Sequence, residues 1–201
     1  MRAMLCIGLL AAAAAALLVT AAPAGEKGKE PGKEKPTNPK ELLGKEAPDF
    51  SLDTIDGGNF KLSGHREASI VVLTFWVSRF PASASGMPVV VGVTSKFKDK
   101  GVVFCAVSVK EDAEAVRKFQ TERKLQFPSA LDKDGEVAKK YLVAGMPHTA
   151  VVDKDGTVQA VHPGFGPDLK TGLTKQLETL TAGKKLVKPP EEKPPEGEGA
   201  K

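Results

Sequence analysis

Residues 69–76 read Ser-Ile-Val-Val-Leu-Thr-Phe-Trp, a nearly continuous apolar run of strand length. Such a run predicts a strand that is covered on both faces at the centre of a sheet. Residues 102–109 are similarly apolar and predict a second buried strand. Between the two we expect a helix over residues 82–99, kinked at Pro88 because proline interrupts the helical hydrogen bonds. Two strands joined by a crossover helix predict a parallel pair.

Outward from this unit, the pattern predicts two hairpins and three more helices. The hairpins are expected over residues 49–62 and 148–161, where Asp-Gly-Gly and Asp-Lys-Asp-Gly form turns between short apolar segments. Apolar residues at helical spacing predict helices over residues 111–123, 136–142 and 169–180. The fold class is therefore α/β, with a mixed central sheet, parallel core strands, an N-terminal β-hairpin and flanking helices.

The two ends of the chain differ in composition from its middle. Residues 1–24 place one charge, Arg2, before an Ala/Leu-rich run that ends in Ala-Pro-Ala, and we expect a signal peptide there. The alternative is an uncleaved membrane anchor, because the run is just long enough to span a bilayer. Either way the sequence predicts export to the periplasm, the cell envelope or the medium. Residues 25–40 and 182–201 are expected to be disordered, which leaves one domain over residues 41–181.

The distribution of charge argues against nucleic acid as a partner. The sequence has a net charge of +4 and a pI near 9.0. Residues 41–181 carry 18 basic and 18 acidic side chains, so the basic excess belongs to the ends. A phosphate-binding face would need Lys and Arg clustered on the folded part, which the sequence does not indicate.

Cysteine content limits the redox chemistry. The sequence has two cysteines, Cys6 in the predicted signal peptide and Cys105 in the predicted strand 102–109. The mature chain would hold one thiol, which cannot form an intramolecular disulfide. We expect Cys105 to be an inert core thiol on a sheet face covered by helix. The three histidines lack metal-ligand spacing, so no metal and no other cofactor is predicted.

The order of elements resembles the thioredoxin-like fold, and local passages resemble the TlpA/ResA group of exported thiol-disulfide oxidoreductases and their AhpC/TSA-related redoxin relatives. The resemblance spans roughly residues 45–180. The passages are Gly-Lys-Glu-Ala-Pro-Asp-Phe at 44–50, Phe-Trp-Val-Ser at 75–78 with Pro81 and Met87-Pro88, Phe127-Pro128 through Gly145-Met146-Pro147, and Val-Val-Asp-Lys-Asp-Gly at 151–156. This resemblance implies a three-layer sandwich and a family activity in thiol-disulfide exchange or peroxide removal.

The chain departs from this family at the chemistry. The family has Trp-Cys-Pro-Pro-Cys after the strand, whereas Phe80 and Ser83 occupy the two cysteine positions here. Phenylalanine can neither attack a disulfide nor resolve a mixed disulfide. We expect the Ser83 hydroxyl to cap the first helical turn rather than act as a nucleophile. Glu111 falls near an acid that assists proton transfer in some relatives, and we interpret it as a helix N-terminal residue.

The resemblance also implies a binding groove beside a cis-proline loop. Pro147 matches the family's cis-proline, and His148 could line the same groove. No catalytic residue is assigned, and Cys105 is the alternative candidate for a reactive thiol. The groove is expected to contain Trp76, Phe80, Pro81, Ser83, Met146, Pro147 and His148.

Three functions are compatible with this sequence. The first is a non-catalytic module that binds another envelope or secreted protein or peptide through the groove. The second is a thiol-disulfide oxidoreductase or peroxide-detoxifying redoxin that acts through Cys105 with an external thiol. The third is an envelope structural or spacer protein, suggested by the charged, Pro-rich ends. Membrane contact is expected only if the leader stays uncleaved.

Overall fold

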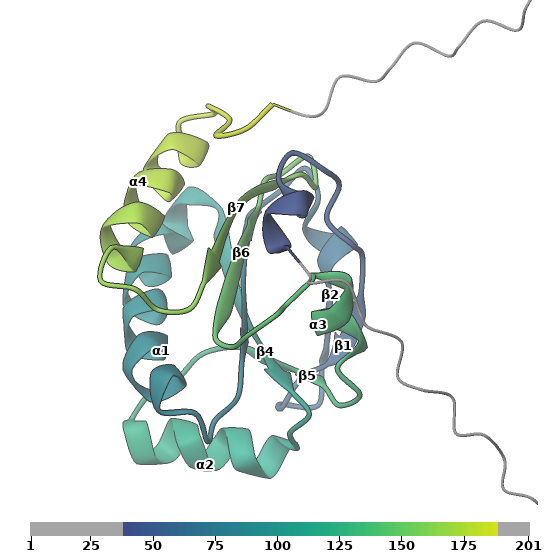
Figure 1. The fold of residues 1–201 in the computed structure, drawn as a ribbon, viewed down its shortest axis with the longest axis vertical. Coiled ribbons are helices and arrows are strands. Elements are labelled where there is room, and N and C mark those ends of the chain that lie inside the picture. The colour runs from purple at the N-terminus through teal and green to yellow at the C-terminus, as the bar shows by residue number, and fades with distance from the viewer. Residues whose placement is uncertain (1–37, 189–201) are drawn as a thin grey trace, which may run out of the picture. The chain divides into compact units, whose positions relative to one another are not determined.

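The computed structural model describes residues 38–188, which are built around a five-stranded sheet (Figure 1). The strands follow the order β5-β4-β3-β6-β7. Their bounds are β3 (Ile70–Trp76), β4 (Val102–Val109), β5 (Ser129–Asp132), β6 (His148–Val152) and β7 (Val158–Pro163). β4 runs parallel to β3 and β5, whereas β6 runs antiparallel to β3 and β7. The sheet is therefore mixed with parallel core strands, which confirms the prediction.

Helices and a hairpin cover the two faces of this sheet (Figure 1). One face carries α1 (Pro81–Thr94) and α4 (Leu169–Thr181), and α2 (Ala113–Arg123) packs in the same cluster as the first half of α1. The opposite face carries the hairpin of β1 (Ser51–Asp53) and β2 (Asn59–Lys61), together with α3 (Glu136–Lys140). Short 3-10 helices are η1 (Pro39–Leu42), η2 (Leu62–His65) and η3 (Ser95–Lys100). The three layers match the expected sandwich.

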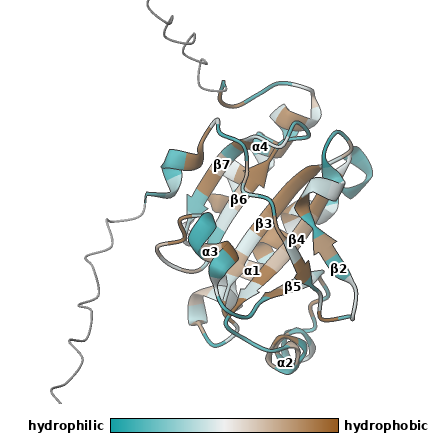
Figure 2. Ribbon diagram, turned by 90° about the vertical axis from the view of Figure 1, so that its right-hand side faces the viewer, coloured by the Kyte–Doolittle hydropathy of each residue, from teal (hydrophilic) through white to brown (hydrophobic). Residues whose placement is uncertain are grey.

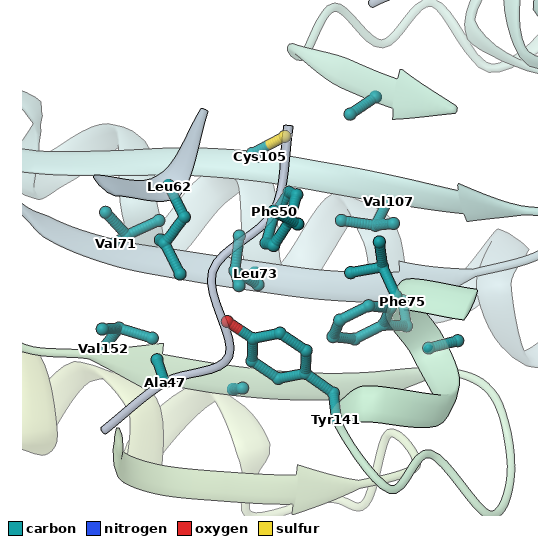
Figure 3. Packing of buried hydrophobic residues seen from close by; sticks show 14 of the residues in the cluster. Ala47, Phe50, Leu62, Val71, Leu73, Phe75, Cys105, Val107, Tyr141 and Val152 are labelled. Carbon is teal, nitrogen blue, oxygen red and sulfur yellow. The ribbon is translucent and has the colours of Figure 1, made fainter. Parts of the chain in front are cut away.

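The core on the hairpin side is rich in aromatic rings (Figure 3). Tyr141 contacts Phe75 of β3 and Phe50, which precedes β1, with ring centroids 5.0 and 6.1 Å apart. Its hydroxyl donates a hydrogen bond to the carbonyl oxygen of Pro48 at 3.0 Å. A buried tyrosine needs such a partner for its hydroxyl. The packing ties the segment before the hairpin to the centre of the sheet.

The part of the helical-side core around α4 is mostly aliphatic. The four leucines of α4 at positions 169, 173, 177 and 180 are buried, which confirms the predicted apolar face. They share one cluster with Val90 and Val93 of α1 and with strand residues Ile70, Val72, Val102, Val151 and Ala160. Figure 2 shows hydrophobic residues concentrated on the central strands, while α3 is largely hydrophilic. Both faces of the sheet are thus covered, as a continuous apolar strand requires.

The structure differs from the expectation in four places. One is η1, which begins inside the segment 25–40 that was expected to be disordered. Strand β5 is not among the predicted elements. The single helix expected over residues 82–99 is α1 followed by η3, because the chain tightens into a 3-10 helix at Ser95. Folded chain also continues past position 181, where the N–H groups of Leu186 and Val187 donate to Oε1 of Gln159 at 2.8 and 3.1 Å.

The predicted signal peptide over residues 1–24 lies outside the described residues. The same holds for residues 25–37 of the first predicted disordered segment and for residues 189–201 of the second. Within residues 38–188, no helix is both long and apolar enough to cross a bilayer.

Candidate functional site

The candidate site lies at the start of α1, directly after β3. Phe80 is the last extended residue before the helix, and Pro81 is the first helical residue. Proline suits this position because its φ is preset for the helix and its missing N–H would have no intrahelical partner. The N–H of Ser83 donates to the carbonyl oxygen of Phe80 at 2.9 Å. The sequence therefore starts the helix at the point where the resemblance places the family's cysteine motif.

The expected capping role of Ser83 is wrong. The helix begins at Pro81, so Ser83 lies inside the first turn rather than before it, and Phe80 holds the capping position without a side-chain hydrogen bond. The Ser83 side chain is fully buried, and its Oγ has no hydrogen-bond partner among residues 38–188. A buried hydroxyl of this kind is also out of reach of a substrate.

Phe80 is the most conspicuous residue of the site. Its side chain is 36% exposed, and among the described residues it is the one large hydrophobic side chain at the surface. The guanidinium carbon of Arg79 lies 5.5 Å from the centre of its ring. The ring borders a hollow of about 430 Å³ that is lined by Ser78, Arg79, Phe80, Pro81, Ala84, Ser85 and Arg123.

A buried carboxylate, that of Glu111, supports the segment before Phe80. The Glu111 side chain is 5% exposed and accepts hydrogen bonds from the Ser78 N–H at 2.8 Å, the Ser78 hydroxyl at 2.7 Å and the Ser108 hydroxyl at 3.0 Å. The Arg79 guanidinium lies 3.7 Å away. The interpretation of Glu111 as a helix N-terminal residue is therefore incomplete, because Asp112 caps α2 by accepting from the Ala115 N–H at 2.8 Å.

Sequence reasoning missed this contact, although a signal for it was present. Ser78 follows β3 and Glu111 follows β4, and the two strands run parallel. The carboxyl ends of parallel neighbours meet at one edge of a sheet, which is where functional groups of open α/β sheets gather.

The predicted groove is only partly present as an open surface. The Met146–Pro147 peptide bond is cis, which confirms that prediction. Pro147 and His148 are buried, and Met146 is half-buried. Trp76 is fully buried against Phe119 and Phe127. Of the seven expected groove residues, Phe80 and Pro81 are exposed, and the hollow beside them is not lined by the three residues of the cis-proline loop.

His148 faces the core and not the groove. Strand alternation places it on the same side of the sheet as Phe75, whose ring centre is 6.3 Å from the imidazole. Neither ring nitrogen has a hydrogen-bond partner within residues 38–188. Burial, with a smaller effect from His162, lowers the pKa of His148 to about 4. The imidazole is therefore neutral at pH 7 and is too enclosed to act as a base on a bound partner.

Cys105 is a buried thiol at the centre of β4, as predicted. It is 0% exposed, and burial raises its pKa to about 12. Its cover differs from the expected helix, because Cys105 belongs to the cluster between the sheet and the hairpin, near Phe50 and Leu62 (Figure 3). Because the reactive species is the thiolate, this environment disfavours thiol chemistry in the folded state.

The described residues offer no arrangement that would hold a metal ion. Over residues 38–188, no three His, Cys, Asp or Glu side chains come together as metal ligands. The site presents an exposed aromatic ring, two arginines and small side chains around one hollow.

Known proteins resemble this chain in sequence. The profile of the AhpC/TSA family matches residues 43–161. The thiol-disulfide oxidoreductase ResA of Bacillus thuringiensis subsp. konkukian is 33% identical over 139 residues, which make up 69% of this chain and 79% of that protein. ResA of Geobacillus kaustophilus is 33% identical over 138 residues, or 69% of this chain and 78% of its own length.

Solved structures share the fold. A Chlorobium tepidum protein described as the thiol:disulfide interchange protein DsbE has a TM-score of 0.63 at 32% identity, covering 68% of this chain and 95% of its own. DsbF of Mycobacterium tuberculosis has a TM-score of 0.58 at 28% identity, covering 65% and 94%. A secreted disulfide oxidoreductase of the same organism, at 22% identity and a TM-score of 0.56, covers 65% and 96% and supports the fold alone.

The family profile covers more than half of the sequence, and the fold agrees with it. This chain therefore belongs to the AhpC/TSA family, as a thioredoxin-like redoxin related to the ResA thiol-disulfide oxidoreductases.

Proposed function

We propose that this protein is a thioredoxin-like module that binds a protein or peptide at the start of α1, without a dithiol cycle of its own. Phe80 carries the proposal, because an exposed aromatic ring stands where the resemblance places the first cysteine of the family. Exposed aromatic rings beside a hollow are typical anchors of protein interfaces. Ser83, at the second cysteine position, is buried and beyond the reach of a partner.

The state of the thiols supports the same proposal. Disulfide exchange needs a thiolate that a partner can reach and a second thiol that resolves the mixed disulfide. The sequence has two cysteines, and Cys6 lies in the predicted signal peptide. Cys105 is enclosed in the core with a raised pKa. Loss of the family's cysteine pair is thus part of the proposal.

Site-specific photocrosslinking in the source cells tests the binding function. A photoreactive phenylalanine analogue replaces Phe80 in the full chain, and the matched control carries it at Val187, a half-buried residue beyond the end of α4. We expect a discrete protein or peptide adduct from position 80 and none from position 187. The absence of an adduct at position 80, or equal adducts at both positions, would overturn the proposal.

A second candidate function is a thiol oxidoreductase that uses Cys105 with an external thiol. Its support is the name of the two ResA relatives, both thiol-disulfide oxidoreductases at 33% identity. Such a reaction requires β4 to open, because the sulfur lies inside the core. Titration with a thiol reagent under native conditions, with assays of insulin reduction and peroxide consumption, decides between the two functions. Turnover that disappears in Cys105→Ala would establish the oxidoreductase, and an unreactive thiol without turnover would exclude it.

The proposal includes a location outside the cytoplasm. Its support is the signal-peptide pattern of residues 1–24. Fusion of residues 1–40 to an alkaline phosphatase, which needs an oxidising compartment for its disulfides, tests export. Phosphatase activity is expected, and an inactive fusion would contradict the location.

A further inference from the structure

α1 reaches the surface without carrying any charge. Residues 80–95 contain no Asp, Glu, Lys or Arg. The exposed residues of the helix are Pro81, Ala82, Ser85, Pro88 and Gly92. A surface helix of a globular protein typically places charged or polar residues toward the solvent. Within the described residues, nothing covers this outer side of α1.

Three hollows lie along the helix. The first is the hollow of about 430 Å³ beside Phe80. The second measures about 310 Å³ and is lined by Pro88, Val89, Gly92, Val93, Lys96 and Lys170. The third measures about 300 Å³ and is largely apolar, and Val91, Phe104, Phe127 and Lys98 are among its lining residues. A segment that follows α1 would therefore meet several places for apolar side chains.

Every charged side chain that lines these three hollows is basic. The five are Arg79, Lys96, Lys98, Arg123 and Lys170. Residues 41–181 as a whole carry 18 basic and 18 acidic side chains, so this one-sided charge does not follow from composition. The acids next in sequence to these cations, such as Asp99 and Glu122, are not among the lining residues. The surface thus combines partly apolar hollows with positively charged residues at their borders.

The two arginines of the first hollow are partly fixed in position. Arg79 lies over the ring of Phe80, and the guanidinium carbon of Arg123 lies 5.9 Å from the ring centre of Phe119. Glu111 pairs with Arg79, but its carboxylate is already bound by two serines, and the Arg79 side chain is 64% exposed. A guanidinium held on an aromatic ring offers a planar set of donors that matches a carboxylate.

We propose that the α1 surface, made of the three hollows and their five basic residues, binds an acidic peptide segment of a partner protein. Aromatic or aliphatic side chains of this segment enter the hollows, and its Asp or Glu side chains meet the cations. An apolar centre with charges of one sign at the border selects a partner of the opposite sign. This inference rests on the proposed binding function and adds the chemical class of the partner.

Peptide selection on the full chain tests directly whether the partner is an acidic peptide. Short random peptides are selected on the immobilised protein, and we expect enrichment of Asp and Glu together with Phe, Leu or Ile. The best fluorescein-labelled peptide is then compared with a twin in which Gln and Asn replace Glu and Asp. The twin should bind at least about tenfold more weakly at about 50 mM salt, and the difference should shrink at about 500 mM. Enrichment of basic or uncharged peptides would overturn the inference.

Charge reversal locates the contact. The test variant, Lys96→Glu with Lys98→Glu, reverses two positive charges at the α1 surface. The control variant, Lys133→Glu with Lys140→Glu, makes the same change in net charge on the other face of the sheet, where Lys140 lies in α3 and Lys133 precedes it (Figure 1). The first pair should weaken peptide binding about tenfold, and the control pair less than about twofold. Equal weakening by both pairs, or by neither, would contradict the inference. So would binding of the chain to vesicles of phosphatidylglycerol and phosphatidylcholine without binding of the peptide.

The two proposals can fail separately. One result would contradict the inference about the α1 surface but support the binding function. In that result, position 80 still crosslinks to its partner in the Lys96→Glu/Lys98→Glu variant, and the selection yields uncharged peptides. If position 80 gives no adduct at all, the binding function falls, and the inference that rests on it falls with it.

Discussion

The carboxylate of Glu111 accepts hydrogen bonds from the backbone N–H and the hydroxyl of Ser78, at 2.8 and 2.7 Å. Ser78 follows β3 and Glu111 follows β4, so these bonds join the carboxyl ends of two parallel strands. The Ser108 hydroxyl donates to the same carboxylate at 3.0 Å. The position of Phe80, two residues after Ser78, therefore depends on an acid that follows the neighbouring strand.

Replacement of this acid should destabilise the fold. Glu111→Ala leaves the Ser78 N–H and the hydroxyls of Ser78 and Ser108 without their acceptor, so we expect a loss of about 1–3 kcal/mol in the free energy of unfolding. Glu114→Ala, on the exposed side of α2, is the control and should change stability by less than about 0.5 kcal/mol. Urea unfolding measures both variants. Similar losses in the two variants would show that the buried hydrogen bonds are not the cause.

The contact between Gly86 and Phe165 gives a second prediction, with opposite signs for two glycines of one helix. A Cβ at position 86 would overlap the ring of Phe165, whereas a Cβ at position 92 meets nothing within 4 Å. Gly86→Ala should therefore destabilise the protein by about 1–3 kcal/mol through overpacking. Gly92→Ala should stabilise it by up to about 1 kcal/mol, because alanine favours the helix. Thermal unfolding of the two variants measures whether each one loses or gains stability relative to wild type.

A double mutant identifies the cause of the Gly86 effect. In a Phe165→Ala background the ring is absent, so the additional cost of Gly86→Ala should largely disappear. An unchanged cost in that background would assign the effect to the helix backbone rather than to the ring.

Burial of His148 predicts a dependence of stability on pH. Its pKa is lowered to about 4 in the folded protein, from an ordinary value of 6.5. Between these two values the unfolded chain binds a proton at this residue and the folded chain does not, so acidification favours unfolding. The contribution of neutral His148 is complete above about pH 6.5 and is lost below about pH 4. As the pH falls through this window, the urea midpoint of wild type should decrease relative to that of His148→Leu, and parallel curves would contradict the assignment.

Much of this fold could be predicted from sequence because its strands and helices have strong local patterns. The apolar runs gave β4 and β6 with their observed bounds, and the leucines of α4 marked its buried face. β5 lacks such a pattern, because two of its four residues are polar. Its Asp132 is buried only because the N–H groups of Val137 and Ala138 donate to its carboxylate at 3.2 and 2.8 Å. These two hydrogen bonds come from α3, so the sequence of β5 itself does not indicate that its aspartate can be buried.

The candidate site was harder to predict than the fold, because it depends on which way side chains point. The sequence identified Phe80 and Pro147 correctly as features of the helix start and of a cis-proline loop. It could not show that the register of β6 turns His148 toward Phe75. Nor could it show that starting the helix at Pro81 turns Ser83 inward. A shift of one residue in strand pairing, or in the first residue of the helix, would turn either side chain in another direction.

Introduction of a cysteine pair at the start of α1 tests whether the surrounding fold still supports the chemistry of the relatives. In Phe80→Cys/Ser83→Cys, the first thiol would be partly exposed at a helix N-terminus, which lowers a thiol pKa, and the second would be enclosed one turn later. We expect insulin reduction with dithiothreitol above the wild-type rate, and no gain in the Phe80→Cys single variant, which lacks the resolving thiol. A gain would mean that the cysteine pair alone separates this chain from active relatives. If both thiols titrate and no activity appears, restoring the cysteine pair is not sufficient for the reaction in this fold.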